Sequence, residues 1–264
     1  MDIFERTIRG LEVGLKVGDI ATFDLCTCSV DDDVREVLNR SDLELFSAIP
    51  VRGSSAIVGV LERPTAARGR VGEAMRPLDD SLLVAFDEPI KGFIPKLQET
   101  PYRLVVRGAQ IDGIVTWSDV HKLPVRLLVF ALITHLEMLM AEAIVEHYGE
   151  DGWLEALKPK RRENVNEKIV TLRADELDPP LIELTEFADN KELLVAGPIA
   201  DWEIGSRRAR DELRRIEDLR NKVAHASGFV NDHGDLARFV GVLASAEEWI
   251  ARLQSHRAAD REQH

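Results

Sequence analysis

The sequence predicts an α+β protein of two domains, a repeated strand-and-helix unit followed by an all-helical bundle. A short motif at Val17-Gly18-Asp19 recurs at Val71-Gly72-Glu73, a shift of 54 residues. Alternating apolar residues, typical of half-buried strands, follow each copy. Beyond His121 the alternation ends, and apolar residues recur at the spacing of an α-helix. We therefore expect two domains, 1–122 and 123–264.

Each copy of the repeat is expected to form one helix followed by two strands. The expected helices are 32–39 and 90–99, and the expected strands are 46–51, 56–61, 103–107 and 110–116. A short turn, Arg107-Gly108-Ala109, joins the last two strands. A repeat of this length usually indicates structural units that pair or stack.

The second half is expected to be a helical bundle. Its expected helices are 124–148, 151–157, 162–172, 180–189, 206–226 and 235–254. Pro179-Pro180 and Gly197-Pro198 mark loops because they break helices. The most apolar stretch, 125–144, is long enough to span a membrane. It contains four ionisable groups, His135 and Glu137 among them, so we expect a core helix and no membrane partner.

Composition excludes several classes of function. The net charge of −13 and the pI near 5.1 argue against binding nucleic acid or anionic membranes over the whole surface, while leaving room for a local basic site. Cys26 and Cys28 are the only cysteines, and no further Cys or His cluster completes a metal site. The first ten residues carry charges where a signal peptide needs an apolar core. We therefore expect a cytoplasmic protein with reduced thiols and no metal.

The second copy ends in the pattern Gly-apolar-apolar-Thr-x-x-Asp, at residues 113–119. With the preceding strand, this pattern resembles a CBS domain, and the two copies resemble a CBS pair. The first copy is degenerate but keeps Ile49-Pro50-Val51 and Gly59-Val60-Leu61. The resemblance implies an adenine nucleotide (AMP, ADP or ATP) as a regulatory ligand. It also implies that the Thr116 hydroxyl binds phosphate and that the Asp119 carboxylate accepts ribose hydroxyls.

The same residues allow a purely structural interpretation. A threonine before a helix N-terminus offers a hydroxyl and backbone N–H groups to an anion, but residues 116–119 could instead only cap the following helix. The equivalent positions of the first copy hold Glu62 and Thr65, so a carboxylate replaces the phosphate-binding threonine. We therefore expect one nucleotide per pair.

A polar cluster interrupts the predicted amphipathic helix at 211–228. The apolar face of this helix comprises Leu213, Ile216, Leu219, Val223 and Ala224. Arg220 projects within that face, and a guanidinium there must be paired or bind a ligand. Asn221 and His225 border the same face, so the three polar side chains have the geometry of a site.

An arginine followed by a polar residue, with a histidine five positions after the arginine, resembles the motif of HEPN domains, which are helical bundles. The resemblance implies a metal-independent endoribonuclease that needs no cofactor, cuts single-stranded RNA and acts as a homodimer. The residues suit cleavage by a 2′-hydroxyl: His225 can transfer the proton, Arg220 can bind phosphate oxygens, and Asn221 can orient either partner. Glu137 is a further candidate for this catalytic site, and it is either the salt partner of Arg220 or a solvent-facing side chain.

Two functions follow from these patterns. The preferred one is an endoribonuclease whose CBS pair senses an adenine nucleotide and alters a composite site in a homodimer. The alternative is a non-catalytic adenine-nucleotide-binding and dimerisation protein, in which Arg220 and His225 hold the bundle together. Exposure of these two residues in a cleft at a dimer interface favours the nuclease, and burial in one protomer's core favours the alternative.

Overall fold

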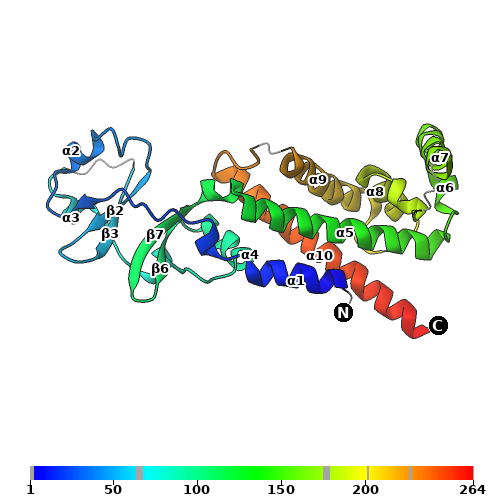
Figure 1. Cartoon of the computed structure of the whole chain (residues 1–264), viewed down its shortest axis with the longest axis horizontal. Coiled ribbons are helices and arrows are strands. Elements are labelled where there is room, and N and C mark those ends of the chain that lie inside the picture. Colours follow the sequence, from blue (N-terminus) through cyan, green and yellow to red (C-terminus); the bar gives the residue numbers. More distant parts are fainter. Residues whose placement is uncertain (1–2, 64–67, 175–178, 201, 226–227, 264) are drawn as a thin grey trace. The chain divides into compact units, whose positions relative to one another are not determined.

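The computed structural model describes residues 3–63, 68–174, 179–200, 202–225 and 228–263. The chain forms two compact units, called here the sheet unit and the helical unit. The sheet unit comprises Gly10–Arg126 and Val230–Leu236, and the helical unit comprises Met1–Arg9, Leu127–Phe229 and Ala237–His264. The helices α1 (Ile3–Gly14), α5 (Leu123–Tyr148) and α10 (His233–Gln263), which are labelled in Figure 1, each have residues in both units.

The sheet unit contains two small sheets. One has the order β1 (Cys28–Ser29), β2 (Ala48–Arg52), β3 (Ile57–Glu62), β4 (Arg76–Pro77), and the other has the order β5 (Leu83–Ala85), β6 (Tyr102–Arg107), β7 (Gln110–Thr116). Val51 pairs with Gly59 in the first sheet, and Val105 pairs with Gly113 in the second, each just before a bulge. The two pairs are 54 residues apart, so the predicted repeat is confirmed.

The opening segments of the two copies are exchanged between the sheets. Strand β4 follows α3 (Val71–Ala74), which opens the second copy, yet it pairs with β3 of the first. In return, Thr22 of the first copy exchanges two backbone hydrogen bonds with Ile114 on β7. The opening turn η1 (Val17–Asp19) likewise donates backbone hydrogen bonds to the carbonyls of residues 86 and 88.

Short helices connect the strands of both copies. In the first copy, Asp33 is the N-cap of α2 (Val34–Leu38), and its carboxylate accepts hydrogen bonds from two backbone N–H groups of the first turn. In the second copy, the expected helix 90–99 is only one turn of α-helix, α4 (Ile90–Phe93), followed by the 3₁₀ helix η3 (Ile94–Gln98). Pro95, in the first turn of η3, has no N–H to continue the α-helical hydrogen bonds. The 3₁₀ helices η2 (Asp80–Leu82) and η4 (Trp117–His121) complete the unit.

The helical unit contains α6 (Trp153–Ala156), α7 (Pro159–Ala174), the 3₁₀ helix η5 (Leu181–Leu184), α8 (Phe187–Ala196) and α9 (Ser206–Ala224), with most of α5 and α10. The predicted helix at 180–189 is wrong. Glu186 and Asp189 form a capping box, in which each side chain meets the other residue's backbone, and this starts α8 at Phe187. With two sheets in one unit and only helices among the described elements of the other, the α+β class is confirmed.

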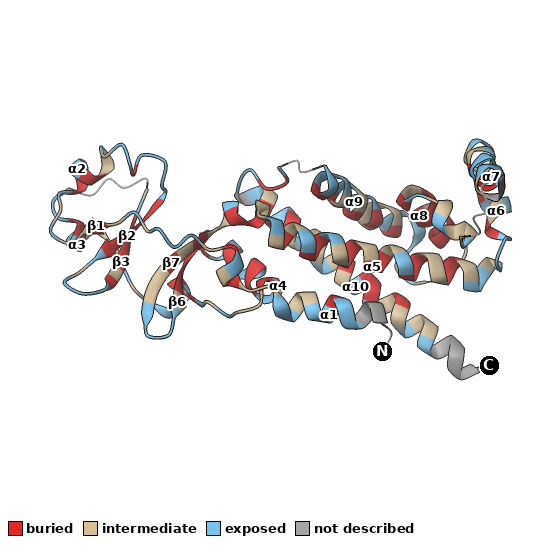
Figure 2. Ribbon diagram, viewed as in Figure 1, coloured by how far each residue is buried: buried red, intermediate tan, exposed pale blue. Residues whose placement is uncertain are grey.

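The long helix α5 is central to the helical unit. Leu136, Met140 and Ile144 are fully buried, and Figure 2 shows buried positions along much of its length. The Glu142 carboxylate pairs with Arg257 of α10, and the Glu137 carboxylate pairs with Arg220 of α9. By length and composition α5 could cross a membrane, but 56% of its most apolar window is buried inside the chain, as in a core helix. A core helix meets the same criteria, so the helix is weak evidence for a membrane span.

Candidate functional site

A cavity of about 410 Å³ lies in the sheet unit and is lined by both copies of the repeat. The apolar lining residues are Leu25, Leu45, Phe46, Ala48, Pro50, Pro101, Ile114 and Trp117. The polar lining residues are Thr22, Asp24, Cys26, Ser47, Thr116, Ser118 and Asp119. The strand exchange brings these residues together, because the segment that contains Thr22 and Asp24 is hydrogen-bonded to β7.

The two residues predicted to bind a nucleotide both line this cavity, and they bind each other. Asp119 Oδ2 accepts hydrogen bonds from the Thr116 backbone N–H at 2.6 Å and from the Thr116 hydroxyl at 3.0 Å. Together they form a capping box at the start of η4. The other carboxylate oxygen, Oδ1, lies 2.8 Å from the Lys122 ammonium. The predicted capping role is therefore confirmed, and ligand binding stays a prediction.

The corresponding positions of the first copy are occupied differently. Glu62 Oε1 accepts a hydrogen bond from the Tyr102 hydroxyl at 2.5 Å and lies 3.6 Å from the Arg76 guanidinium. Burial, followed by the neighbouring Glu62 carboxylate, raises the pKa of Tyr102, so the phenol stays protonated and donates. The other predicted position, Thr65, lies outside the described residues. The Glu62 carboxylate is thus already used in contacts within the protein.

Several lining residues were not predicted from the sequence. Asp24, Cys26 and Phe46 belong to no local motif, and they reach the cavity only through the fold. The sequence could have indicated Trp117 as a lining residue, because it lies between Thr116 and Asp119 in the identified motif. A local motif thus indicates Thr116 and Asp119, whereas only the fold places Asp24, Cys26 and Phe46 in the cavity lining.

The second candidate site lies in the helical unit, where α9 contacts α5. The Arg220 guanidinium is 3.4 Å from Glu137 Oε1 and donates a weak hydrogen bond of 3.4 Å to Asn221 Oδ1. The ion-pair interpretation of Glu137 is thus the one that the structure shows. His225 forms the C-cap of α9 and is exposed, as is Asn221, while Arg220 is half-buried.

Both carboxylates and cationic side chains surround this cluster. Burial raises the pKa of Glu137, the nearby Glu217 raises it further, and Arg220 opposes both. Glu217 is itself paired with the buried ammonium of Lys191 at 2.7 Å. Arg220 Nε is buried without a hydrogen-bond partner within the described part of the chain. The unpartnered donor is therefore buried, while the Arg220 side chain as a whole is 38% exposed next to the exposed Asn221.

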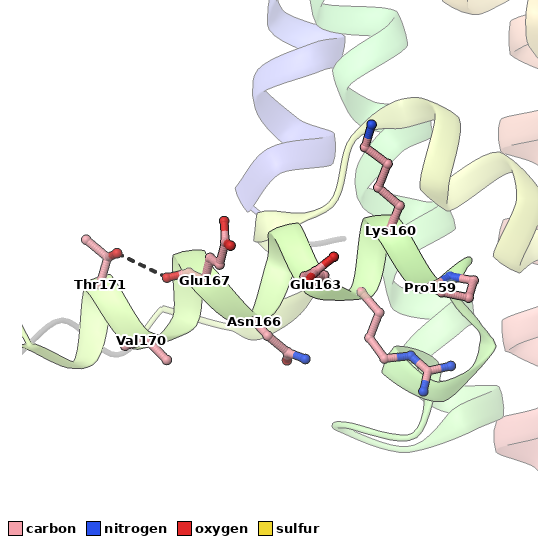
Figure 3. A pocket seen from close by; sticks show the side chains of 8 residues that line it. Pro159, Lys160, Glu163, Asn166, Glu167, Val170 and Thr171 are labelled. Atoms are coloured by element: carbon pink, nitrogen blue, oxygen red, sulfur yellow. Dashed lines mark hydrogen bonds between the residues drawn. The ribbon is translucent and has the colours of Figure 1, made fainter.

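A hollow of about 1050 Å³ in the helical unit does not enclose a ligand. Its lining residues all come from one helix, α7, so no opposite wall encloses a ligand (Figure 3). The side chains drawn there, such as Lys160, Glu163 and Asn166, point away from the helix without converging on a common point. Over the described residues, no group of three or more His, Cys, Asp or Glu side chains could hold a metal ion.

No protein-family model matches the sequence, and no curated protein matches it. Among solved structures, the chain is similar to the CBS domain of a bacterial CNNM/CorC family Mg²⁺ transporter in complex with ATP, with 21% identity and a TM-score of 0.36, covering 44% of this chain and 91% of that one. It is also similar to CBSX2 in complex with AMP, with 23% identity and a TM-score of 0.35, covering 40% and 93%. The CBS domains of a transcriptional regulator from Streptococcus pneumoniae give 20% identity and a TM-score of 0.35, covering 40% and 96%.

Proposed function

We propose that the sheet unit binds an adenine nucleotide and that the chain is a regulatory protein controlled by this ligand. The observation that carries the proposal is that Thr116 and Asp119 line one cavity together with residues of the other copy. Its volume of about 410 Å³ is within the range of small-molecule pockets, which are mostly apolar with a few polar groups. A flat base fits between apolar walls, and a carboxylate accepts ribose hydroxyls.

Regulation follows from where the cavity lies. A ligand that touches both copies stabilises the arrangement in which they are joined and disfavours any other arrangement. The joined state depends on the pairing of Thr22 with Ile114, two residues that also line the cavity. Nucleotide binding is therefore expected to raise the stability of the sheet unit in the state in which its two copies are joined.

The two cysteines provide a test that locates the ligand. Cys26 lines the cavity and is exposed, whereas Cys28 is buried, and burial raises the pKa of its thiol to about 11. Saturating AMP should slow alkylation of Cys26 by iodoacetamide, while Cys28 stays unreactive with or without AMP. Calorimetric titration should give binding under the same conditions. If neither AMP, ADP nor ATP binds, or if Cys26 reacts equally fast at saturation, the proposal is wrong.

The accessible position of Arg220, Asn221 and His225 supports a second function, metal-independent cleavage of single-stranded RNA. Asn221 and His225 are exposed, and the Arg220 side chain is 38% exposed, so none of the three is sealed in the core. Arg220 would hold the phosphate, and Glu137 would fix the guanidinium from the other side. His225 would transfer the proton of the 2′-hydroxyl.

A homodimer would supply the second acid or base that this reaction uses. On α5, Leu127, Phe130 and Met138 are exposed apolar side chains. Phe130 lies two helical turns from Glu137, so this apolar surface runs beside the Glu137–Arg220 pair. A second copy that covers the surface would bring two sets of Arg220 and His225 together.

Cleavage is tested with mixed single-stranded RNA in EDTA, comparing Arg220→Ala and His225→Ala with the control Arg214→Ala, an exposed residue of the same helix. Both site variants should lose cleavage while the control keeps it. Cleavage that is absent, or equal in all four folded proteins, rules out the second function. Sedimentation of the wild type and of Phe130→Asp tests the dimer, because a wild-type monomer leaves the composite site without its second half.

A further inference from the structure

The charged side chains on the wall of the sheet-unit cavity are carboxylates. Among the described residues that line it, none is Lys, Arg or His, and two, Asp24 and Asp119, are carboxylates. Lys122 is next to Asp119 but does not line the cavity. Its ammonium donates to the Ile20 carbonyl at 2.6 Å and pairs with Asp119 Oδ1.

Three hydrogen-bond donors at the Thr116 end of the cavity are already used within the protein. The Thr116 backbone N–H and hydroxyl donate to Asp119, and the Thr116 hydroxyl is also 2.7 Å from the Ser118 hydroxyl. The Trp117 backbone N–H donates to the Pro101 carbonyl at 2.9 Å. Phosphate oxygens need charged or polar donors, and these three donors are not available to them.

The remaining wall suits a base and a sugar instead. Phe46, Pro50, Pro101 and Trp117 provide apolar surface for a flat ring. Carboxylates accept hydrogen bonds from hydroxyl groups. The charge of Asp119 is balanced by Lys122, whereas no ion pair involves Asp24 within the described part of the chain, so Asp24 is the uncompensated charge.

We infer that this cavity selects nucleosides and nucleoside monophosphates over di- and triphosphates, and that the Asp24 carboxylate enforces the selection. The inference rests on the nucleotide-binding function proposed above. Each added phosphate brings more negative charge toward Asp24. Repulsion between like charges is stronger in a partly enclosed cavity than in water, and the net charge of −13 opposes a polyanion further.

The test is a calorimetric titration series with adenosine, AMP, ADP and ATP at one ionic strength, first in EDTA and then with Mg²⁺. AMP should bind at least about tenfold more tightly than ATP in EDTA, and Mg²⁺ should narrow this gap, because the bound cation neutralises part of the triphosphate charge. Asp24→Asn should bring the affinity for ATP several-fold closer to that for AMP and leave adenosine unchanged, since the amide keeps an acceptor oxygen. The control Asp87→Asn removes an exposed carboxylate that does not line the cavity and should keep the wild-type ratio.

The outcomes separate this inference from the function on which it rests. If wild-type protein binds ATP as tightly as AMP in EDTA, or if Asp24→Asn leaves the ratio unchanged, the charge selection is wrong while nucleotide binding stands. If adenosine, AMP, ADP and ATP all fail to bind, both proposals are wrong. Raising the ionic strength should narrow the gap between AMP and ATP, because salt screens the exposed Asp24.

Discussion

Replacing Asp119 by alanine should destabilise the sheet unit before any ligand is considered. The Asp119 carboxylate accepts two hydrogen bonds from Thr116 and pairs with Lys122. Alanine removes all three contacts and leaves the Thr116 backbone N–H without its acceptor. Asp119→Asn is the matched control, because the Asn side-chain oxygen can still accept from that N–H, while the charge is lost.

The magnitude follows from these contacts. Losing a cap costs about 1 kcal/mol, and leaving a partly buried N–H unsatisfied brings this to about 2–3 kcal/mol. The ion pair with Lys122 adds at most about 1 kcal/mol, since the Lys122 side chain is 40% exposed. Asp119→Ala should therefore lower the free energy of unfolding by about 2–4 kcal/mol, and Asp119→Asn by about 1 kcal/mol.

Urea denaturation and native-state hydrogen exchange measure the two effects. At about 2 kcal/mol per molar urea, the midpoint of the alanine variant should fall by about 1–2 M. The Thr116 amide should exchange faster in Asp119→Ala than in Asp119→Asn. The reasoning is refuted if Asp119→Ala keeps the wild-type midpoint and exchange rate. It is also refuted if both variants lose equal stability, because charge and not hydrogen bonding would then matter. Asp119→Asn is accordingly the variant in which altered nucleotide affinity can be interpreted.

Three further predictions concern stability, each measured by urea denaturation. Arg103→Lys should cost about 2–4 kcal/mol, because the buried guanidinium donates to three backbone carbonyls that an ammonium cannot all reach. Gly59→Ala should cost about 1–3 kcal/mol, because the added Cβ would lie 2.5 Å from a backbone oxygen. Gly10→Ala is the control: Gly10 lies in α1 with open space around it, so alanine should stabilise the protein by about 0.5–1 kcal/mol. Folding raises the pKa of Glu137 above its ordinary value of 4.5. The stability that the protonated carboxyl contributes is therefore fully present below pH 4.5 and is lost as the pH rises through the raised pKa. Glu137→Gln should abolish this pH dependence of the unfolding free energy.

The parts of the fold that the sequence predicted are those set by local patterns. Alternation over five or more residues located β6 and β7 to within one residue, and helical periodicity located α5 and α9 to within about two. The strands β1, β4 and β5 span only two or three residues, too few for a period of two to be visible. The exchange of opening segments was not predictable, since hydrogen bonds between residues 22 and 114 leave no pattern in the chain.

The residues of the candidate sites likewise divide into those that a local pattern predicted and those that only the fold brings together. Thr116 and Asp119 were identified from the local pattern Gly-apolar-apolar-Thr-x-x-Asp, and the same three-residue spacing makes them a capping box. The pairing of Arg220 with Glu137 was one of two interpretations, because helical phase places an arginine on an apolar face without saying which helix faces it. Asp24 was missed, since an exposed aspartate in a loop has no distinguishing neighbours in sequence. Only its position in the cavity lining indicates that Asp24 can contact a ligand.

The exchange of opening segments makes each copy of the repeat an incomplete folding unit. A fragment that ends between β3 and α3 would lack β4 and expose the edge of β3, while the remaining fragment would lack the Thr22 bridge to β7. Each fragment carries the piece that the other is missing. The sheet unit is thus a natural candidate for split-protein complementation, in which two separately expressed pieces reassemble and rebuild the shared cavity.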